Sequence, residues 1–496
     1  MTVQVDGTYT SQKVTNFGVR SLIIYGTIFF AIALLSLFHV PGEPFGVLSL
    51  LPVCFTIVAA IATKRALEPL VAGVIVGILL LDPTNVFTQL GSISTNAFNN
   101  ATVIWIILVC GMLSGIIVML ERCGSVLSFG DFLAGRIKTK RRAMLVTSGL
   151  GVLVFIDDYL NALAVSSSMK STTDRFNISR EKLSYIVDST AVPVCILVPI
   201  STWAVFFTAL LEENNVAAKG EGFMLYLESI PYMFYGWLAL FFVWLVAMGY
   251  FRDFPLMKKA ELRAQAGQPI PEGCQTDGFD TSHIVKTSST TMGLLNFFLP
   301  ITVLVAASVY YDIDLLLGSL VASAFTMIFY MLQNLMTFNQ LVESMLDGFK
   351  LMLLPFAIII AGFMLKDVND SLDMTSYVMD SVIPYLNKEL FAAIIFLVMA
   401  GIVFATSSAW GMFVIALPII VPLAQGVDAS MPLVIGAVMS ASAFGCHACF
   451  YGVSTLLSAQ GSECTTMQHA LSQLPYTLLA GALTVVMLVA AGYLLP

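Results

Sequence analysis

Three aspartates stand in strongly apolar sequence, and their side chains are the ones best suited to bind ions. Asp157 and Asp158 are adjacent in the run 155–161, and Asp188 follows in the run 183–194. A carboxylate that loses its water binds a proton more readily, and a second carboxylate beside it strengthens that preference. Such a group can hold either a proton or a small metal cation. Competition between H⁺ and Na⁺ for one carboxylate would by itself exchange one ion for the other.

Hydroxyl and amide groups beside the aspartates supply the oxygen ligands that a small hard cation prefers. The predicted cation- and proton-binding residues are Asp157, Asp158, Asn161, Asp188, Ser189 and Thr190, with Na⁺ held at the three aspartates. A structural alternative stays open for each kind of residue. Asp158 could instead cap the helix that follows it, and Asp188 could hold a helix break open. Ser and Thr also bond across membrane helices for structural reasons alone.

The second half of the chain places hydroxyls and one histidine in comparable apolar surroundings. The predicted cavity is completed by Thr406, Ser407, Ser408, Ser440, Ser442 and His447 and shaped by Ser201, Thr202, Trp203 and Trp410. A histidine can change its charge near neutral pH, so His447 is either a proton relay or a packed side chain bonded to a carbonyl. The two tryptophans either contact an organic substrate or pack between helices.

The composition shows that membrane-spanning elements must position these residues. Of 496 residues, 58% are hydrophobic and only 11% are charged, which excludes a soluble globular protein. The apolar residues suffice for roughly a dozen spans of about 20 residues. The net charge of −8 comes without a large basic cluster, which excludes a nucleic-acid partner. The eight cysteines form no metal or disulfide framework, and no cofactor is expected.

Apolar runs and basic residues together predict the topology. The predicted spans are 21–38, 45–62, 66–81, 101–120, 186–211, 232–250, 292–311, 315–332, 349–365, 431–457 and 475–495, and the apolar stretch 389–421 is too long for one span. Lys and Arg collect on the cytoplasmic side of a membrane protein. Lys64 and Arg65 lie between the second and third spans, whereas 82–100 has no basic residue. The N-terminus is therefore predicted to be cytoplasmic, and the first span to be retained rather than cleaved as a signal peptide.

The apolar stretch 143–168 has basic clusters on both sides, in 136–142 and in 170–182. A single span would put one of these clusters outside. The stretch is therefore predicted to enter the membrane and return as a re-entrant hairpin, with Asp157 and Asp158 at its tip. Non-helical backbone at that depth is tolerated only where it is buried in protein or lines a wet cavity.

An internal repeat relates the two halves of the chain. Elements that start at 45, 66, 101 and 155 recur at 292, 315, 349 and 404, at offsets of 247 to 249 residues. Each half has an odd number of crossings, so the second half is inverted relative to the first. Inverted repeats with interrupted helices are the arrangement of secondary transporters, whose site lies near the midplane.

The predicted fold class is an all-α polytopic membrane protein with an inverted-topology repeat, two re-entrant hairpins and two broken helices. The helix breaks are predicted at 188–193 and 440–445. The predicted domains are an extra N-terminal transmembrane helix (1–40), a first repeat (41–251), a cytoplasmic linker (252–290) and a second repeat (291–496) with its hairpin at 389–421.

Four segments carry a resemblance to a known family: 155–161, 179–194, 199–203 and 252–261. They resemble the NhaC-type sodium/proton antiporters of the ion transporter superfamily. The resemblance implies a bacterial inner-membrane carrier, commonly a homodimer, whose hairpins and broken helices form a mobile transport unit. Relatives in this family include carriers of carboxylic acids and amino acids, and these segments do not separate them from ion exchangers.

Two transport functions follow from these observations, and an enzymatic function does not. The first is Na⁺/H⁺ antiport by alternating access, with both ions competing for the buried aspartates. The alternative is Na⁺- or H⁺-coupled transport of a small carboxylate or amino acid. The sequence contains no HExxH, GxSxG or P-loop motif, so no hydrolase or nucleotide-dependent enzyme is predicted.

Overall fold

The computed structural model describes most of the chain. The described residues are 26–27, 29–34, 43–63, 65, 67–125, 128, 137–271, 274, 290–311, 314–450 and 452–494. Every regular element in this part is helical, and nine helices are long and apolar enough to cross a membrane, or up to eleven if two bent helix pairs are counted. The predicted fold class, an all-helical polytopic membrane protein with interrupted helices, is confirmed. Of the predicted first span only 26–27 and 29–34 are described, and the part of the linker from 275 to 289 lies outside the described residues.

The first half contains helices on both sides of the predicted hairpin tip. They are η1 (Gly46–Leu50), α2 (Leu51–Thr63), α3 (Leu67–Leu81), α4 (Val86–Asn99), α5 (Ala101–Arg122), α7 (Lys140–Leu153), α8 (Asp158–Arg175), α9 (Arg180–Asp188), α10 (Val192–Leu197), α11 (Thr202–Glu213), α12 (Gly222–Ser229), η2 (Ile230–Tyr232), α13 (Phe234–Met248) and α14 (Pro255–Gln265).

The second half contains the remaining helices of the described residues. Its helices are α15 (Thr290–Tyr310), α16 (Leu315–Leu332), α17 (Phe338–Leu351), α18 (Leu353–Ser371), α19 (Met374–Val382), η4 (Ile383–Tyr385), α20 (Lys388–Thr406), α21 (Ala409–Gly426), α22 (Met431–Ala448), α23 (Val453–Ser462) and α24 (Thr466–Leu494).

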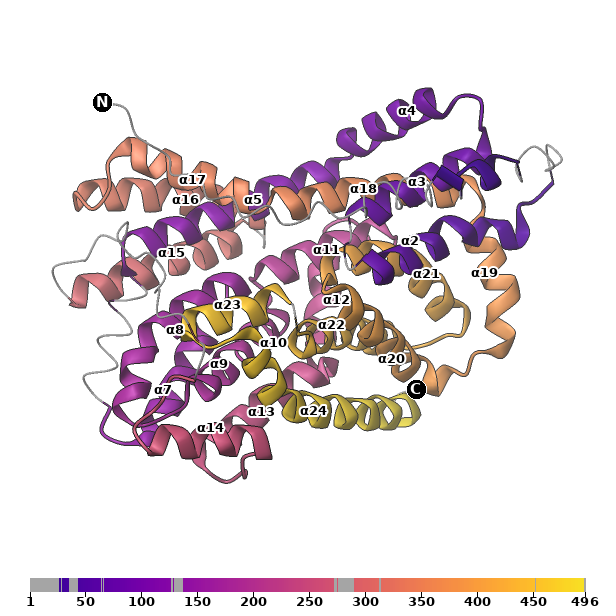
Figure 1. The fold of residues 1–496 in the computed structure, drawn as a ribbon. Coiled ribbons are helices and arrows are strands. Elements are labelled where there is room, and N and C mark those ends of the chain that lie inside the picture. Colours follow the sequence, from indigo (N-terminus) through magenta and orange to yellow (C-terminus); the bar gives the residue numbers. More distant parts are fainter. Residues whose placement is uncertain are drawn as a thin grey trace.

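The two halves contribute to two layers. Figure 1 shows α3, α5, α16, α17 and α18 in one row, with α13, α14 and α24 at the opposite edge of the molecule. Within the first layer, α5 packs on α17 and α3 on α18. The first pair approaches so closely that a Cβ added at Gly348 would lie 2.2 Å from the backbone nitrogen of Gly115. Small residues allow such contact between membrane helices. The second layer contains α7–α14 and α20–α24.

Each half has a helix pair with a short break at the predicted hairpin position. In the first half α7 ends at Leu153 and α8 begins at Asp158, and the two helices pack on each other. In the second half α20 ends at Thr406 and α21 begins at Ala409, with Ser407 in the left-handed region at φ +56°. These breaks bring polar backbone and side-chain groups into the second layer.

One helix break was predicted correctly and the other was not. The chain is interrupted between Asp188, the last residue of α9, and Val192, the first of α10. The break predicted at 440–445 is wrong, because α22 runs without interruption to Ala448 and ends where Cys449 becomes extended. The segment 440–445 is rich in small residues but lacks proline, and its alanines are strong helix formers. Small residues there permit close packing rather than a break.

Several helices lie wholly or mostly outside the predicted apolar spans. These are α4, α12, α14, α17 and α19. Helix α14 lies inside the segment predicted as a linker, and α24 begins at Thr466 rather than at 475. This earlier start matters for the site, because it adds polar residues to a helix of the second layer.

Candidate functional site

Asp157 organises the tip of the first hairpin. Its side chain caps α8, accepting hydrogen bonds through Oδ1 from the backbone N–H groups of Tyr159 (2.9 Å) and Leu160 (3.1 Å). Its Oδ2 accepts from the Thr202 hydroxyl at 3.1 Å. The carboxylate is 4% exposed. The capping role predicted as an alternative for Asp158 therefore belongs to its neighbour, because Asp157 has the extended backbone that an N-cap requires.

Asp158 has a different environment. It is 3% exposed, and its Oδ1 accepts a hydrogen bond from the Trp203 indole N–H at 2.9 Å. Trp203 in turn packs near Trp410, with ring centroids 6.0 Å apart. The two tryptophans thus join the second hairpin to the first and shape the surroundings of Asp158.

The hairpin tip is held against the segment between α10 and α11. The backbone N–H of Thr202 donates to the carbonyl of Ile156 at 3.0 Å, and the Cys195 thiol donates to the carbonyl of Phe155 at 3.3 Å. Ser201 caps α11 by accepting from the backbone N–H of Ala204 and also donates to the carbonyl of Cys195. Ser201 and Thr202 therefore position the tip.

Asn161 joins the hairpin to the first helix break. Its amide nitrogen lies within hydrogen-bond distance of the carbonyl oxygens of Gly151 (2.6 Å), Val154 (3.1 Å) and Thr190 (2.8 Å). Only the NH₂ group can face three carbonyls, which fixes the orientation of the amide. Its Oδ1 is buried without a hydrogen-bond partner among the described residues. This oxygen is a free ligand for a cation beside the tip.

Asp188 is fully buried at the end of α9, where residues of the second half surround it. Its Oδ1 accepts from the Ser454 hydroxyl at 2.6 Å. Its Oδ2 accepts from the Gln473 amide at 2.7 Å and the Thr455 hydroxyl at 3.2 Å, and lies 3.2 Å from Nε2 of His469. The predicted site residues did not include these four partners. Asp188 therefore joins the two halves of the chain.

Ser189 and His447 form a second link between the repeats. The Ser189 hydroxyl lies 3.1 Å from Nε2 of His447, and the Tyr235 hydroxyl lies 2.7 Å from Nδ1 of the same ring. The His447 carbonyl accepts from the Gln473 amide at 2.6 Å. His447 thus has partners at both ring nitrogens and lies one side chain away from the partners of Asp188. By contrast, the Thr190 hydroxyl, in the break after α9, donates to the carbonyls of Ile186 and Val187 in the last turn of that helix.

The remaining predicted residues of the second half are less closely connected. Thr406 donates to the carbonyl of Ile402, and Ser408 caps α21. Ser440 accepts from the backbone N–H of Tyr235 across helices. Of these predicted residues, Ser407 and Ser442 have buried hydroxyls without a hydrogen-bond partner among the described residues.

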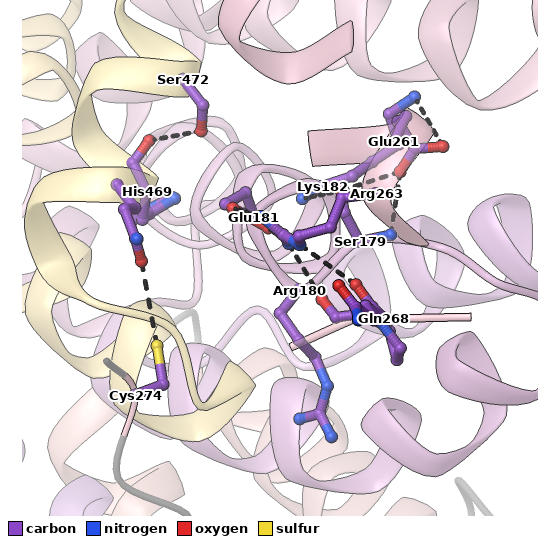
Figure 2. A network of polar contacts seen from close by, with 12 residues as sticks. Ser179, Arg180, Glu181, Lys182, Glu261, Arg263, Gln268, Cys274, His469 and Ser472 are labelled. Carbon is purple, nitrogen blue, oxygen red and sulfur yellow. Dashed lines mark hydrogen bonds and ion pairs between the residues drawn. The ribbon is translucent and has the colours of Figure 1, made fainter. Parts of the chain in front are cut away.

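A buried charged run closes one side of this layer, and Figure 2 shows it together with α14 and part of α24. Residues 179–182 are all buried. Arg263 on α14 makes a two-pronged ion pair with Glu181, at 2.9 and 2.7 Å. Glu261 on α14 pairs with Lys140 at 2.6 Å and lies 3.5 Å from Lys182. We refer to the side of the molecule where α14 lies as the linker side.

The electrostatics of Glu261 show how this run is stabilised. Burial alone would raise the pKa of its carboxyl, but the charges of Lys182 and Lys140 outweigh burial and hold the pKa below its ordinary value. The carboxylate also accepts hydrogen bonds from the backbone N–H and the hydroxyl of Ser179. A buried charge needs this kind of compensation. The ion pairs therefore dock α14 onto the start of α9.

The arrangement suits a small cation more than a tightly held resident metal. Within the described residues, no three His, Cys, Asp or Glu side chains are grouped so that they could hold a metal ion. The ligands on offer are instead single carboxylates, hydroxyls, an amide oxygen and the carbonyls of the helix breaks. Hard oxygen ligands of this kind match Na⁺ and similar ions.

Comparisons with known proteins add a family and a fold. The model of the Na⁺/H⁺ antiporter family matches residues 215–493. An uncharacterized protein of Haemophilus influenzae is 25% identical over 489 residues, which cover 90% of this chain and 91% of that protein. The matched family segment includes the second-half partners of Asp188 but none of the three aspartates.

Two solved transporter structures are similar to this chain. The YdaH transporter of Alcanivorax borkumensis, described as having an unusual topology, gives a TM-score of 0.50 at 14% identity and covers 90% of this chain and 99% of its own. MtrF of Neisseria gonorrhoeae, described within a class of antimetabolite efflux pumps, gives a TM-score of 0.41 at 13% identity and covers 82% of this chain and 83% of its own. The first likeness shows a shared fold.

Proposed function

The chain belongs to the Na⁺/H⁺ antiporter family, and we propose that it exchanges Na⁺ for H⁺ across a bacterial cytoplasmic membrane by alternating access. The observation that carries the proposal is the placement of three buried carboxylates at interrupted helices of the second layer. Buried carboxylates in a membrane protein mark ion or proton paths. The oxygen groups around them suit Na⁺ as the transported ion, with no further cofactor.

In this proposal the three aspartates have different roles. Asp157 is occupied by capping α8 and by Thr202, so it shapes the tip. Asp158 accepts from one side-chain donor, Trp203, and is therefore the freer of the pair to take Na⁺ or H⁺. The unpartnered Oδ1 of Asn161 offers a neutral ligand near this tip.

Asp188 gives the site its connection to both repeats. Its donors come from α23 and α24, and its neighbour Ser189 contacts His447 on α22. A cation or proton that takes the place of these donors must change the contacts between α9 and the second repeat. Ion binding at Asp188 is thereby coupled to the packing of the transport layer.

The proposal is tested by proton flux in liposomes that hold the purified protein and a pH-sensitive dye. Adding NaCl is expected to move protons, and choline chloride is expected to have no effect. Asp158→Asn and Asp188→Asn are each expected to slow the exchange by at least about tenfold, which corresponds to roughly 1.4 kcal/mol of lost ion binding. The control is Asp428→Asn, since the Asp428 side chain is 99% exposed and remote from the tip.

Other outcomes would redirect the assignment. Exchange at the parent rate in both site variants would exclude the carboxylate mechanism. The absence of proton flux with NaCl, LiCl and KCl, in vesicles shown to be sealed, would exclude cation/proton antiport. Accumulation of a small carboxylate or amino acid under a Na⁺ or H⁺ gradient would then support the alternative predicted from the sequence.

A further inference from the structure

Three neighbouring helices present polar side chains to one another along a line that leads away from Asp188. Helices α9, α23 and α24 pack on each other pairwise. Residues four positions apart share one face of a helix. These faces carry Arg180, Ser184 and Asp188 on α9, Ser454, Ser458 and Ser462 on α23, and His469 and Gln473 on α24. We call this set of eight residues the polar seam.

The inner end of the polar seam is Asp188 itself. Its carboxylate takes hydrogen bonds from Ser454 and Gln473 and lies against His469. All of these side chains are at most 3% exposed. The seam therefore begins at the carboxylate that we place in the ion site, and not on the lipid-facing surface.

The middle of the polar seam contains polar atoms that the protein leaves unpaired. Among the described residues, the hydroxyls of Ser458 and Ser462, Nδ1 of His469 and Oε1 of Gln473 are buried and have no hydrogen-bond partner. Buried polar groups in native proteins nearly always have a partner, and an unpaired one calls for a water molecule or an ion. Ser458 and Ser462 lie one turn apart on α23, and His469 and Gln473 one turn apart on α24, so each of these packed helices carries unpaired polar atoms in successive turns.

Two other buried hydroxyls of the same layer are satisfied within their own helices. Ser166 donates to the carbonyl of Ala162, and Thr484 donates to the carbonyl of Ala480, each four residues back along its own helix. This is the usual way in which a hydroxyl is satisfied inside a membrane helix. Ser458 and Ser462 do not adopt it, so their hydroxyls stay available to a ligand between the helices.

The outer end of the polar seam is closed by ion pairs on the linker side. Arg180 donates to the carbonyl of Ser462 at 2.8 Å and lies 3.4 Å from a carboxylate oxygen of Glu463. Asp174 holds the same guanidinium through two hydrogen bonds, at 2.8 and 2.7 Å. Lys170 pairs with the other oxygen of Glu463. Arg180 is only 4% exposed, so these contacts cover the last serine of the seam.

We propose that the polar seam is the route by which water and Na⁺ reach Asp188 from the linker side, with Arg180 as its closure. The proposal rests on the function proposed above, since it supplies one of the two access routes that alternating access requires. Serine hydroxyls and the Gln473 amide oxygen are neutral oxygen ligands, which allow a small cation to pass without being trapped. For the route to open, the Arg180 guanidinium must break its contacts with Ser462 and Glu463. Its ion pair with Asp174 can remain and balance the charge of the guanidinium.

The first experiment tests access and needs no transport activity. Ser458→Cys and Ser462→Cys are placed separately in the full chain in liposomes and exposed to a cationic, membrane-impermeant methanethiosulfonate. Mass spectrometry of the peptides reads the modification at each position, so the native cysteines do not interfere. Thr484→Cys is the matched control, because Thr484 is equally buried on α24 but is satisfied within its helix.

We expect both seam cysteines to react at least about tenfold faster than the control, since a thiol in wet polar surroundings is reactive and one in apolar packing is inert. Na⁺ is expected to slow the reaction relative to choline. Equal rates at the seam and control positions would overturn the proposal.

The second experiment tests the route in transport. Ser458→Leu fills the seam with apolar volume and is expected to slow Na⁺-driven proton flux by at least about tenfold, as expected when a polar ion path is blocked. Thr484→Leu is the control, because it adds apolar volume at a buried position of the same layer outside the polar seam. Thermal unfolding of each variant checks that it is folded. The labelled Ser458→Cys variant is a second way to block the path.

The two proposals can fail separately. If Asp188→Asn stops exchange while Ser458→Leu and the labelled Ser458→Cys exchange at the parent rate, the seam is not the route and the antiport assignment stands. If the parent protein exchanges no cation at all, the antiport assignment fails. The labelling rates then still decide whether water and small cations enter the seam.

Discussion

At the scale of single residues, Asn161 links the two interruptions on which the candidate site depends. Its amide spans carbonyl groups of the hairpin and of the break after Asp188. Neither interruption has enough backbone partners of its own, because hydrogen bonds within a helix end there. One side chain therefore fixes the distance between the tip with Asp158 and the break with Asp188.

Asn161→Leu removes this link while keeping a side chain of similar size. We expect a loss of about 2 kcal/mol in the free energy of unfolding, because buried carbonyls are left without donors. Thermal unfolding in detergent measures the effect. Asn214→Leu is the control, since Asn214 donates to a single carbonyl at a half-buried helix end. An equal loss in both variants would contradict the linking role.

The partners of Asp188 show what sequence reasoning could reach at this scale. Charged residues in apolar sequence identify Asp157, Asp158 and Asp188 directly. His469 and Gln473 were not predicted as site residues, because they lie in a polar segment before the apolar run that begins near 475. Such a segment looks like a loop in any hydropathy window. It is buried only because α24 starts at Thr466 and packs its first turns against α9.

At the scale of elements, the first hairpin is packed against the helix break by a glycine. A Cβ added at Gly151 on α7 would lie 2.0 Å from the Thr190 hydroxyl oxygen and 2.6 Å from the Thr190 Cβ. The sequence predicts the hairpin and the break from basic flanks and polar residues. It does not show that they touch, because the contact joins segments distant along the chain.

Gly151→Ala tests this contact. We expect a loss of about 1–3 kcal/mol in stability from overpacking, together with slower exchange, because the tip is displaced from the break. Gly149→Ala on the same helix has open space around it. Its stability should be unchanged or higher by up to about 1 kcal/mol, since alanine favours a helix. Similar losses in both variants would point to the helix itself rather than to the contact.

The docking of α14 gives an element-scale prediction with a defined pH dependence. The pKa of Glu261 lies below its ordinary value of 4.5 because Lys182 and Lys140 outweigh the effect of burial. A lowered pKa gives stability that is fully present above about pH 4.5 and is lost as the pH falls through the folded-state pKa. Unfolding temperatures of the parent should therefore drop as the pH falls below about 4.5.

Glu261→Gln should be less stable at neutral pH by about 2 kcal/mol, because Lys140 loses its carboxylate partner and the buried Lys182 keeps Asp253 but loses the charge of Glu261. Its unfolding temperature should also fall less steeply with acid than that of the parent. Glu343→Gln is the control, since Glu343 is exposed on α17. A parallel acid profile for Glu261→Gln and the parent would show that other carboxylates control the acid response.

At the scale of the whole molecule, the order of the main helices could be predicted from the sequence but the layers could not. Constant offsets between element starts require only the order of elements along the chain. The assignment of α5 and α17 to one layer, and of α11 to the other, depends on packing between halves. Glycine contacts such as Gly115 against Gly348 specify that packing. Single glycines in apolar helices do not reveal their partners in sequence.

If the second layer moves as a transport unit against the first, a tether between layers should stop exchange and a tether within one layer should not. Asn100 and Glu213 touch across the layers, at 3.1 Å between Nδ2 and Oε1. Arg122 and Asp347 pair within the first layer, between α5 and α17. Each pair can be replaced by cysteines and bridged with a short bifunctional methanethiosulfonate, with the parent protein as the reagent control.

We expect bridging of the Asn100→Cys/Glu213→Cys pair to abolish Na⁺-driven proton flux, and cleavage of the bridge by a reducing agent to restore it. The bridged Arg122→Cys/Asp347→Cys pair should keep the parent rate. Full exchange through the bridged cross-layer pair would mean that ions move without displacement of the layers. The hairpin tips and the polar seam would then have to open and close the site within a fixed frame.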